Sequence, residues 1–215
     1  MNRIRILPIA FISCVLSANA TAIYNNTGDG NAGDDTFRTS SDFTYGNQFE
    51  TTAGSTLTLT DVIIELGQPS VDGTNSITAY VYSDSGNKPG SVFATIATVP
   101  HSSIPSTPGP VTFTPGSTIT LQPSTEYWIV LSGTSVGAND GEWQLGSTDA
   151  GTGVSSQQHA EYNGSTWTDF ANNLFTNTIP EMEVDTTSAT PEPATLGLMG
   201  ASLAGLAIAG RRRRS

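Results

Sequence analysis

Residues 55–66 read Ser-Thr-Leu-Thr-Leu-Thr-Asp-Val-Ile-Ile-Glu-Leu, and this stretch decides the fold class. Leu57 and Leu59 alternate with threonines, so one face of the segment is apolar and the other is polar. Such alternation is typical of a β-strand that packs one face against a core. The alternation changes phase near Asp61, which predicts a register change within the strand.

Further strand patterns lie on the C-terminal side of this stretch. Residues 77–82 alternate Ile, Ala and Val with Thr, Tyr and Tyr. Shorter β-like runs follow at 92–99, 111–114, 118–121, 127–131, 142–145, 159–162 and 181–184. Gly, Pro, Asn or Ser separates the runs, which is the spacing of an all-β domain. We therefore expect a two-sheet sandwich of the jelly-roll type, with Tyr127 and Trp128 in its core.

The charge of the chain is strongly negative. A length of 215 residues suits one domain with short flanking segments. Between residues 23 and 190 there are eighteen Asp and Glu but only Arg38 and Lys88 as basic residues, a net charge of −16. This balance excludes nucleic acid as a partner and disfavours anionic lipid surfaces. It is compatible with divalent cations, with a cationic polymer, or with solubility alone.

The N-terminal residues have the three regions of a secretory signal. Arg3 and Arg5 accompany an apolar run over 4–16, and two A-x-A cleavage sites follow at 18–20 and 20–22. We therefore assign 1–22 to a signal peptide. Cys14, the only cysteine, falls within it, so the mature domain is expected to contain no disulfide.

The C-terminal residues indicate a membrane anchor. Residues 23–185 are expected to form the extracytoplasmic β-sandwich domain, and 186–193 a linker that ends in a Pro-Glu-Pro motif. Residues 194–210 carry no charge and would span about 25 Å as a helix, which predicts a transmembrane helix. The arginines of 211–215 are expected to stay cytoplasmic, which places the domain on the far side of the inner membrane.

The tail resembles the PEP-CTERM family. The motif residues are Pro191, Glu192, Pro193, Arg211, Arg212, Arg213 and Arg214, with Gly197 and Gly200 in the apolar segment between them. The resemblance implies recognition by exosortase, a membrane enzyme that processes such proteins near Pro-Glu-Pro and releases or reattaches them at the cell surface. It also implies a link to exopolysaccharide and biofilm. Tails of this kind are also grouped under an ice-binding label. The label comes from a protein that carries such a tail, and the tail itself cannot bind ice.

The body resembles the choice-of-anchor R domains that commonly precede such tails. The resemblance rests on Tyr-Gly-Asn-Gln-Phe at 45–49, Ala-Tyr-Val-Tyr at 79–82 with Lys-Pro-Gly at 88–90, and Leu121 with Glu-Tyr-Trp-Ile-Val-Leu at 126–131. No molecular activity is implied by this domain type. The resemblance therefore predicts a location at the cell surface and no reaction.

No catalytic motif is present, and we expect a protein that is not an enzyme. The chain contains neither Gly-x-Ser-x-Gly nor His-Glu-x-x-His. His101 and His159 lie in polar stretches and are expected at the surface. A glycan hydrolase, which would need two carboxylates in different environments, is the least favoured alternative.

Residues 25–35 are rich in Gly, Asn and Asp and are expected to form a loop. The candidate calcium ligands in this loop are Asp29, Asn31, Asp34 and Asp35. Side-chain oxygens are the ligands that Ca²⁺ prefers, although the bidentate acid that ends an EF-hand loop is missing. An ordinary solvated loop is the alternative, and no other cofactor is expected.

Aromatic residues are the candidate glycan-binding groups: Tyr80, Tyr82, Trp143, Tyr162 and Trp167. Apolar ring faces stack on sugar rings, while packing in the core is the competing explanation. Threonines 56, 58 and 60 raise the separate idea of an ice- or surface-binding array. We expect an exported surface or matrix protein that binds polysaccharide, with a calcium-dependent carbohydrate-binding module, an ice binder and a hydrolase as alternatives.

Overall fold

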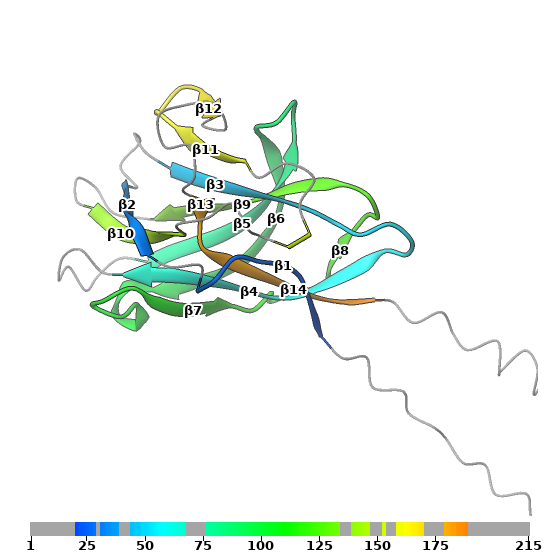
Figure 1. Ribbon diagram of the computed structural model, residues 1–215, viewed down its shortest axis with the longest axis horizontal. Coiled ribbons are helices and arrows are strands. Elements are labelled where there is room, and N and C mark those ends of the chain that lie inside the picture. The colour runs from blue at the N-terminus through cyan, green and yellow to red at the C-terminus, as the bar shows by residue number, and fades with distance from the viewer. Residues whose placement is uncertain are drawn as a thin grey trace, which may run out of the picture.

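The structure is a computed structural model that describes residues 20–28, 31–38, 44–67, 76–133, 139–146, 152–153, 158–169 and 179–188, with the backbone alone for 31–38, 139–140 and 169. The described residues form an all-β fold of two antiparallel sheets that face each other (Figure 1). Within these ranges, no helix has the length and apolar character that a membrane span requires. The predicted membrane helix over 194–210 and most of the predicted signal peptide lie outside the described residues.

The eight-stranded sheet has the order β1-β14-β4-β10-β13, with β2 paired to β10 and with β7 and β8 paired to β4. Its strands are β1 (Thr21–Asn25), β2 (Asn31–Arg38), β4 (Leu57–Gly67), β7 (Gly109–Phe113), β8 (Ile119–Leu121), β10 (Asn139–Gly146), β13 (Ile179–Pro180) and β14 (Met182–Ser188). The six-stranded sheet has the order β12-β11-β3-β9-β5-β6. Its strands are β3 (Thr44–Glu50), β5 (Ser76–Asp84), β6 (Pro89–Pro100), β9 (Glu126–Gly133), β11 (His159–Tyr162) and β12 (Trp167–Asp169).

Strand β4 confirms the predicted register change. On its partner β14, Asp185 faces Asp61 but Thr186 faces Leu59, so Thr60 is an extra residue on β4. This is a β-bulge, which reverses the face on which the following side chains lie. The buried positions accordingly shift from 57 and 59 to 62, 64 and 66. Strand β4 pairs with β8 before the bulge and with β7 after it.

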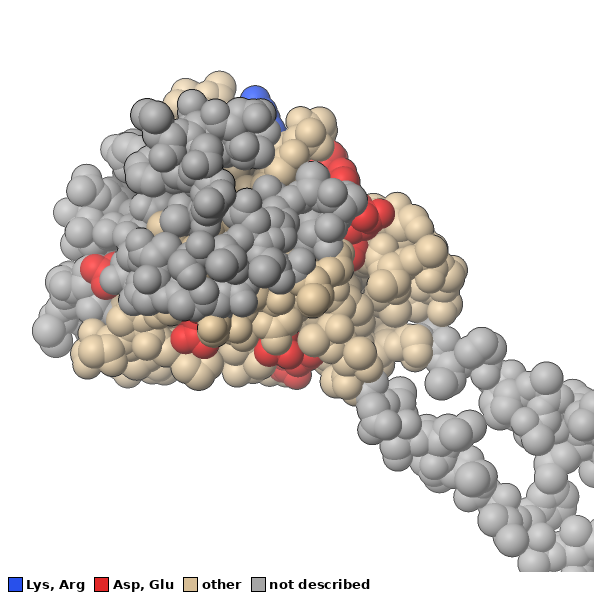
Figure 2. Space-filling model, in the orientation of Figure 1, with Lys and Arg blue, Asp and Glu red and all other residues tan. Residues whose placement is uncertain are grey.

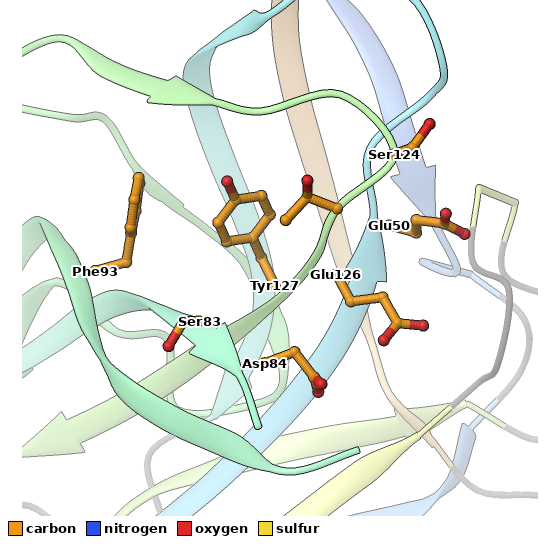
Figure 3. A pocket seen from close by; sticks show the side chains of 8 residues that line it. Glu50, Ser83, Asp84, Phe93, Ser124, Glu126 and Tyr127 are labelled. Carbon is orange, nitrogen blue, oxygen red and sulfur yellow. The ribbon is translucent and has the colours of Figure 1, made fainter. Parts of the chain in front are cut away.

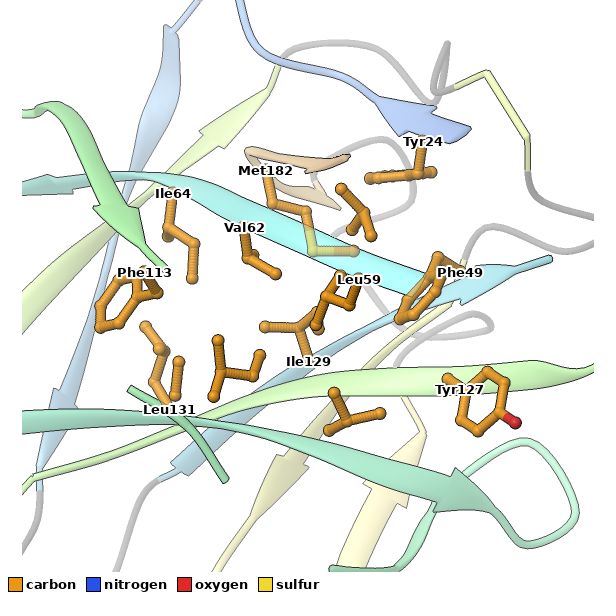
Figure 4. Packing of buried hydrophobic residues seen from close by; sticks show 14 of the residues in the cluster. Tyr24, Phe49, Leu59, Val62, Ile64, Phe113, Tyr127, Ile129, Leu131 and Met182 are labelled. Atoms are coloured by element: carbon orange, nitrogen blue, oxygen red, sulfur yellow. The ribbon is translucent and has the colours of Figure 1, made fainter. Parts of the chain in front are cut away.

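The inner faces of both sheets share one hydrophobic core (Figure 4). Ile64 and Met182 of the eight-stranded sheet and Phe49 and Ile129 of the six-stranded sheet belong to it. Phe49 also stacks on Tyr127, with ring centroids 5.9 Å apart. The prediction that Tyr127 is a core residue is therefore confirmed.

Three sequence-based predictions need correction, two on element boundaries and one on burial. Residues 31–35, expected to be loop, lie in β2, which is held by pairing with β10. Residues 186–188, expected to begin a linker, are the last residues of β14, where Thr186 is buried opposite Leu59. His101 and His159, expected at the surface, are both buried. His159 directly precedes Ala160 in β11, and Ala160 packs on the outer face of the sheet. Because adjacent strand residues lie on opposite faces, the His159 side chain is directed inward.

Candidate functional site

Four of the five predicted aromatic residues meet on the outer face of the six-stranded sheet. They are Tyr80 and Tyr82 of β5, Tyr162 of β11 and Trp167 of β12, and we call them the aromatic surface. The ring centroids lie 6.2 Å apart for Tyr80 and Tyr82, 6.3 Å apart for Tyr82 and Trp167, and 5.3 Å apart for Tyr162 and Trp167. All four side chains are partly exposed, so the cluster is in contact with solvent.

A second, smaller hydrophobic cluster supports the aromatic surface from below. Trp128, Val130 and Ala160 are buried in it, and Tyr82 and Trp167 pack against them. Strands β9 and β3 separate β5 from β11, so the rings of Tyr82 and Trp167 approach each other above these intervening strands. The prediction that Trp128 is buried is confirmed, but it lies on the opposite side of the sheet from the main core.

Gly46 of β3 makes this packing possible. A Cβ atom built at Gly46 would lie 3.2 Å from Pro89 Cγ, 3.2 Å from Val130 Cγ2 and 3.3 Å from Trp128 Cε3. These separations are shorter than ordinary van der Waals contacts. A residue without a side chain at this position therefore allows Pro89 to pack closely over the sheet.

Asp84 lies beside the aromatic surface and accepts three hydrogen bonds. Its Oδ1 atom accepts hydrogen bonds from the Trp128 indole at 2.9 Å and from Gln48 Nε2 at 3.3 Å. Its Oδ2 atom accepts a hydrogen bond from the Asn87 backbone amide at 3.3 Å. Because Asp84 and Tyr82 are two residues apart on β5, they lie on the same face of the sheet. A carboxylate therefore borders the aromatic surface.

The tyrosines of the aromatic surface are suited to hydrogen bonding with neutral hydroxyl groups. Burial raises the pKa of Tyr82, and the neighbouring Tyr80 and Tyr162 raise it further because a second or third phenolate would be repelled. The Tyr82 phenol is therefore protonated at neutral pH and can both donate and accept a hydrogen bond. Polar hydroxyls beside apolar ring faces are the combination that a sugar ring requires.

Trp143 is not part of the aromatic surface, and its assignment to a glycan site was wrong. It is 0% exposed in the main core, where its indole donates a hydrogen bond to the Glu181 backbone oxygen at 2.8 Å. The sequence carries a signal for this position. Trp143 and Leu145 are two residues apart on β10 and share its buried face.

The structure does not bring the candidate calcium ligands together in a loop. Asp29 lies outside the described residues, whereas Asn31, Asp34 and Asp35 belong to β2 and pair with β10. The backbone of these three residues is an extended strand, unlike a loop that wraps around an ion. In the described parts of the chain, no three His, Cys, Asp or Glu side chains are placed to hold a metal ion.

The threonines of β4 are only partly arranged as an exposed array. Thr58 is flanked by Thr187 of β14 and Thr120 of β8, which gives a row across three strands. Thr60 does not extend this row, because its hydroxyl is buried at the bulge. The next pair across β4 and β14 is carboxylic, with Asp61 opposite residue 185. The threonine array, which the sequence raised as an idea, is therefore interrupted on β4.

Comparison with known proteins identifies the C-terminal tail. A family model described as the PEP-CTERM protein-sorting motif matches residues 189–214, which include the Pro-Glu-Pro and arginine residues predicted from the sequence. A comparison with curated proteins finds no match. The resemblance of the body to choice-of-anchor R domains stays a prediction. The chain therefore carries a PEP-CTERM sorting motif, which indicates an exported protein that is sorted at the membrane.

Proposed function

We propose that this chain is an exosortase-sorted cell-surface or matrix protein without catalytic activity, and that its aromatic surface binds polysaccharide. The observation that carries the binding proposal is the meeting of Tyr80, Tyr82, Tyr162 and Trp167 on one sheet face. Rings from three strands form a partly exposed apolar patch on which pyranose faces can stack. The scaffold below them is expected to be of the jelly-roll type.

The sorting part of the proposal is supported by the motif at 189–214. In this proposal, the signal peptide directs export and the apolar segment 194–210 holds the tail in the inner membrane. The arginine cluster stays on the cytoplasmic side, and exosortase acts near Pro191. The β-domain is then exposed to the exopolysaccharide outside the cell.

Polysaccharide binding is tested by titrating the secreted chain with neutral and charged polysaccharides. We expect saturable binding that falls by roughly 5- to 150-fold in Trp167→Ala and Tyr162→Ala, because one stacked ring contributes on the order of 1–3 kcal/mol by analogy with aromatic stacking on nucleobases. Thr120→Ala, an exposed change on the other sheet, is the matched control. A chelator added to each titration separates the calcium-dependent alternative. Binding that is the same in Trp167→Ala and Thr120→Ala would contradict the proposed site.

A further inference from the structure

Val92 extends the aromatic surface to the edge of its sheet. Among the described residues, Val92 and Phe93 of β6 are the two large apolar side chains that are exposed, at 52% and 46%. Val92 lies directly opposite Tyr82 of β5. Directly opposite residues of antiparallel strands share a face, with Cβ atoms about 4.5–5.5 Å apart. Because β12 and β6 are the outermost strands of the six-stranded sheet, the aromatic surface and Val92 together form an apolar track across its whole width.

Phe93 does not belong to the apolar track, although it is the next residue along β6. The register of β6 on β5 shifts immediately before Tyr82, so that Phe93 is the extra residue of a β-bulge. Its ring lies 5.3 Å from the ring of Tyr127, which is part of the main core on the other side of the sheet. The two exposed apolar side chains of β6 therefore serve opposite faces of the sheet.

The rings of the apolar track are steeply tilted against one another. Their planes differ by 89° for Tyr80 and Tyr82, by 73° for Tyr82 and Trp167, and by 50° for Tyr162 and Trp167. Rings that stack together on a crystalline polysaccharide have to be coplanar, because the sugars of a crystal face lie in one plane. A single chain can rotate about its glycosidic bonds and present successive sugars to rings at different angles. The tilts therefore favour one dissolved chain over a crystal surface.

One border of the apolar track is acidic. A cavity of about 590 Å³ opens beside Asp84, and its lining also includes Glu50 and Phe93 (Figure 3). None of the described residues that line the cavity is basic. On the face shown in Figure 2, Asp and Glu are visible at several places among the described residues, and Lys and Arg are scarce. Such surroundings repel a polysaccharide that carries carboxylate groups of its own.

Asp84 is able to bind a hydroxyl group of a neutral sugar. A carboxylate has about four lone-pair sites for hydrogen bonds. In Asp84, Oδ1 accepts from Trp128 and Gln48, whereas Oδ2 accepts from the Asn87 amide. The remaining site on Oδ2 can accept a sugar hydroxyl, and the partly exposed side chain lies on the same face as Tyr82.

We propose that the apolar track binds a single soluble chain of neutral sugars, which crosses the six-stranded sheet from Trp167 to Val92 and directs hydroxyl groups to Asp84. The inference rests on the proposed polysaccharide binding and names its substrate class. Apolar faces of successive sugars lie on Trp167, Tyr82 and Val92 in turn. The acidic border disfavours anionic polysaccharides, and the tilted rings disfavour crystalline ones.

The test titrates the full secreted chain with soluble hexamers of β-linked glucose, galactose and mannose and with a guluronate hexamer, and it measures retention on microcrystalline cellulose. We expect a neutral hexamer to bind, and neither guluronate nor cellulose. The affinity for the neutral hexamer should fall by roughly 3- to 13-fold in Val92→Ser, half the free-energy effect of burying a whole valine, because Val92 is half-exposed.

Phe93→Ser is the matched control, because it removes the neighbouring exposed apolar side chain from the other face of the sheet. Its affinity for the neutral hexamer should equal that of the unchanged chain. Far-UV circular dichroism checks that both variants are folded. Val92→Thr, which keeps the shape of the side chain, replaces Val92→Ser if the latter does not fold.

The outcomes separate this inference from the proposed function. A loss of affinity at Val92 but not in Phe93→Ser supports the track. Equal affinities of the Val92 variant and the unchanged chain, or equal losses in both variants, would overturn it. Binding of cellulose or guluronate that is lost in Trp167→Ala would overturn the inference and leave the proposed polysaccharide function standing, as would binding of other polysaccharides with no neutral hexamer among them. If no polysaccharide binds, both proposals fail.

Discussion

Substitution of Gly46 by alanine tests whether the aromatic surface rests on a closely packed layer. The added Cβ would lie 3.2 Å from Pro89 Cγ and from Val130 Cγ2, and 3.3 Å from Trp128 Cε3. Inserting one methyl group into a packed site of this kind costs about 1–3 kcal/mol. For a domain of this size, each kcal/mol lowers Tm by roughly 2–4 °C, so a decrease of roughly 2–12 °C is expected.

The assay is thermal unfolding followed by far-UV and near-UV circular dichroism, with Gly116→Ala as the control. Gly116 has open space where its Cβ would lie, so alanine there should be neutral or stabilise by about 0.4–1 kcal/mol through the unfolded state. Because Trp128 is one of the crowded groups, the near-UV signal should change in Gly46→Ala and not in the control. Equal Tm values for the two variants would refute the packing that we infer beneath the aromatic surface.

Three further predictions concern other parts of the domain. Burial, and to a smaller extent the facing Asp61, raise the pKa of Asp185 above its ordinary value of 3.8. The folded state therefore binds the Asp185 proton more tightly than the unfolded state does. As a consequence, the free energy of unfolding falls as pH rises through the raised pKa. Asp185→Asn should therefore raise Tm at pH 7, by the equivalent of about 0.2–1 kcal/mol, and should lose this advantage near pH 3 in a pH series of melting curves. Trp143→Phe should cost about 1–3 kcal/mol in chemical denaturation, because a buried carbonyl loses its indole donor, and should leave glycan affinity unchanged in a titration. The assigned signal peptide, 1–22, overlaps β1, in which Thr21 and Ala22 already pair with β14. Signal cleavage should therefore follow Ala20, the earlier of the two predicted sites, and the N-terminal mass of the secreted chain checks this.

The sequence predicts strands well where the alternation is local. In β4 both the apolar face and the register change could be derived, because leucine and threonine alternate up to Asp61 and the buried set shifts after it. In strand β5 the apolar face could also be derived, and its residues Ile77, Ala79 and Val81 are buried. In these segments the side-chain pattern alone determines which face is turned to the core.

Strand β2 could not be predicted, because its formation depends on a distant partner. Gly, Asn and Asp are rare in strands, and residues 31–35 are rich in them. The segment is a strand because it pairs with β10, which lies more than one hundred residues later in the chain. Backbone pairing of this kind leaves no periodic signal in the sequence.

The aromatic site could be predicted in part. Tyr80 and Tyr82 stand on the polar side of an alternating strand, which made them good surface candidates. That Tyr82 meets Trp167 depends on the order of strands β5, β9, β3 and β11, which one sequence does not specify. The cavity around Glu50 and Phe93 was missed for the same reason, since its lining comes from four strands and one turn.

The central claim, sorting by exosortase, is tested most directly by the C-terminal mass of the protein. The intact chain is expressed in a host with exosortase and in the same host without it, and its location and mass are determined in both. The account predicts loss of the tail near Pro191 only in the host that contains exosortase. A membrane-bound protein that keeps Arg211 to Arg214 in both hosts would contradict it.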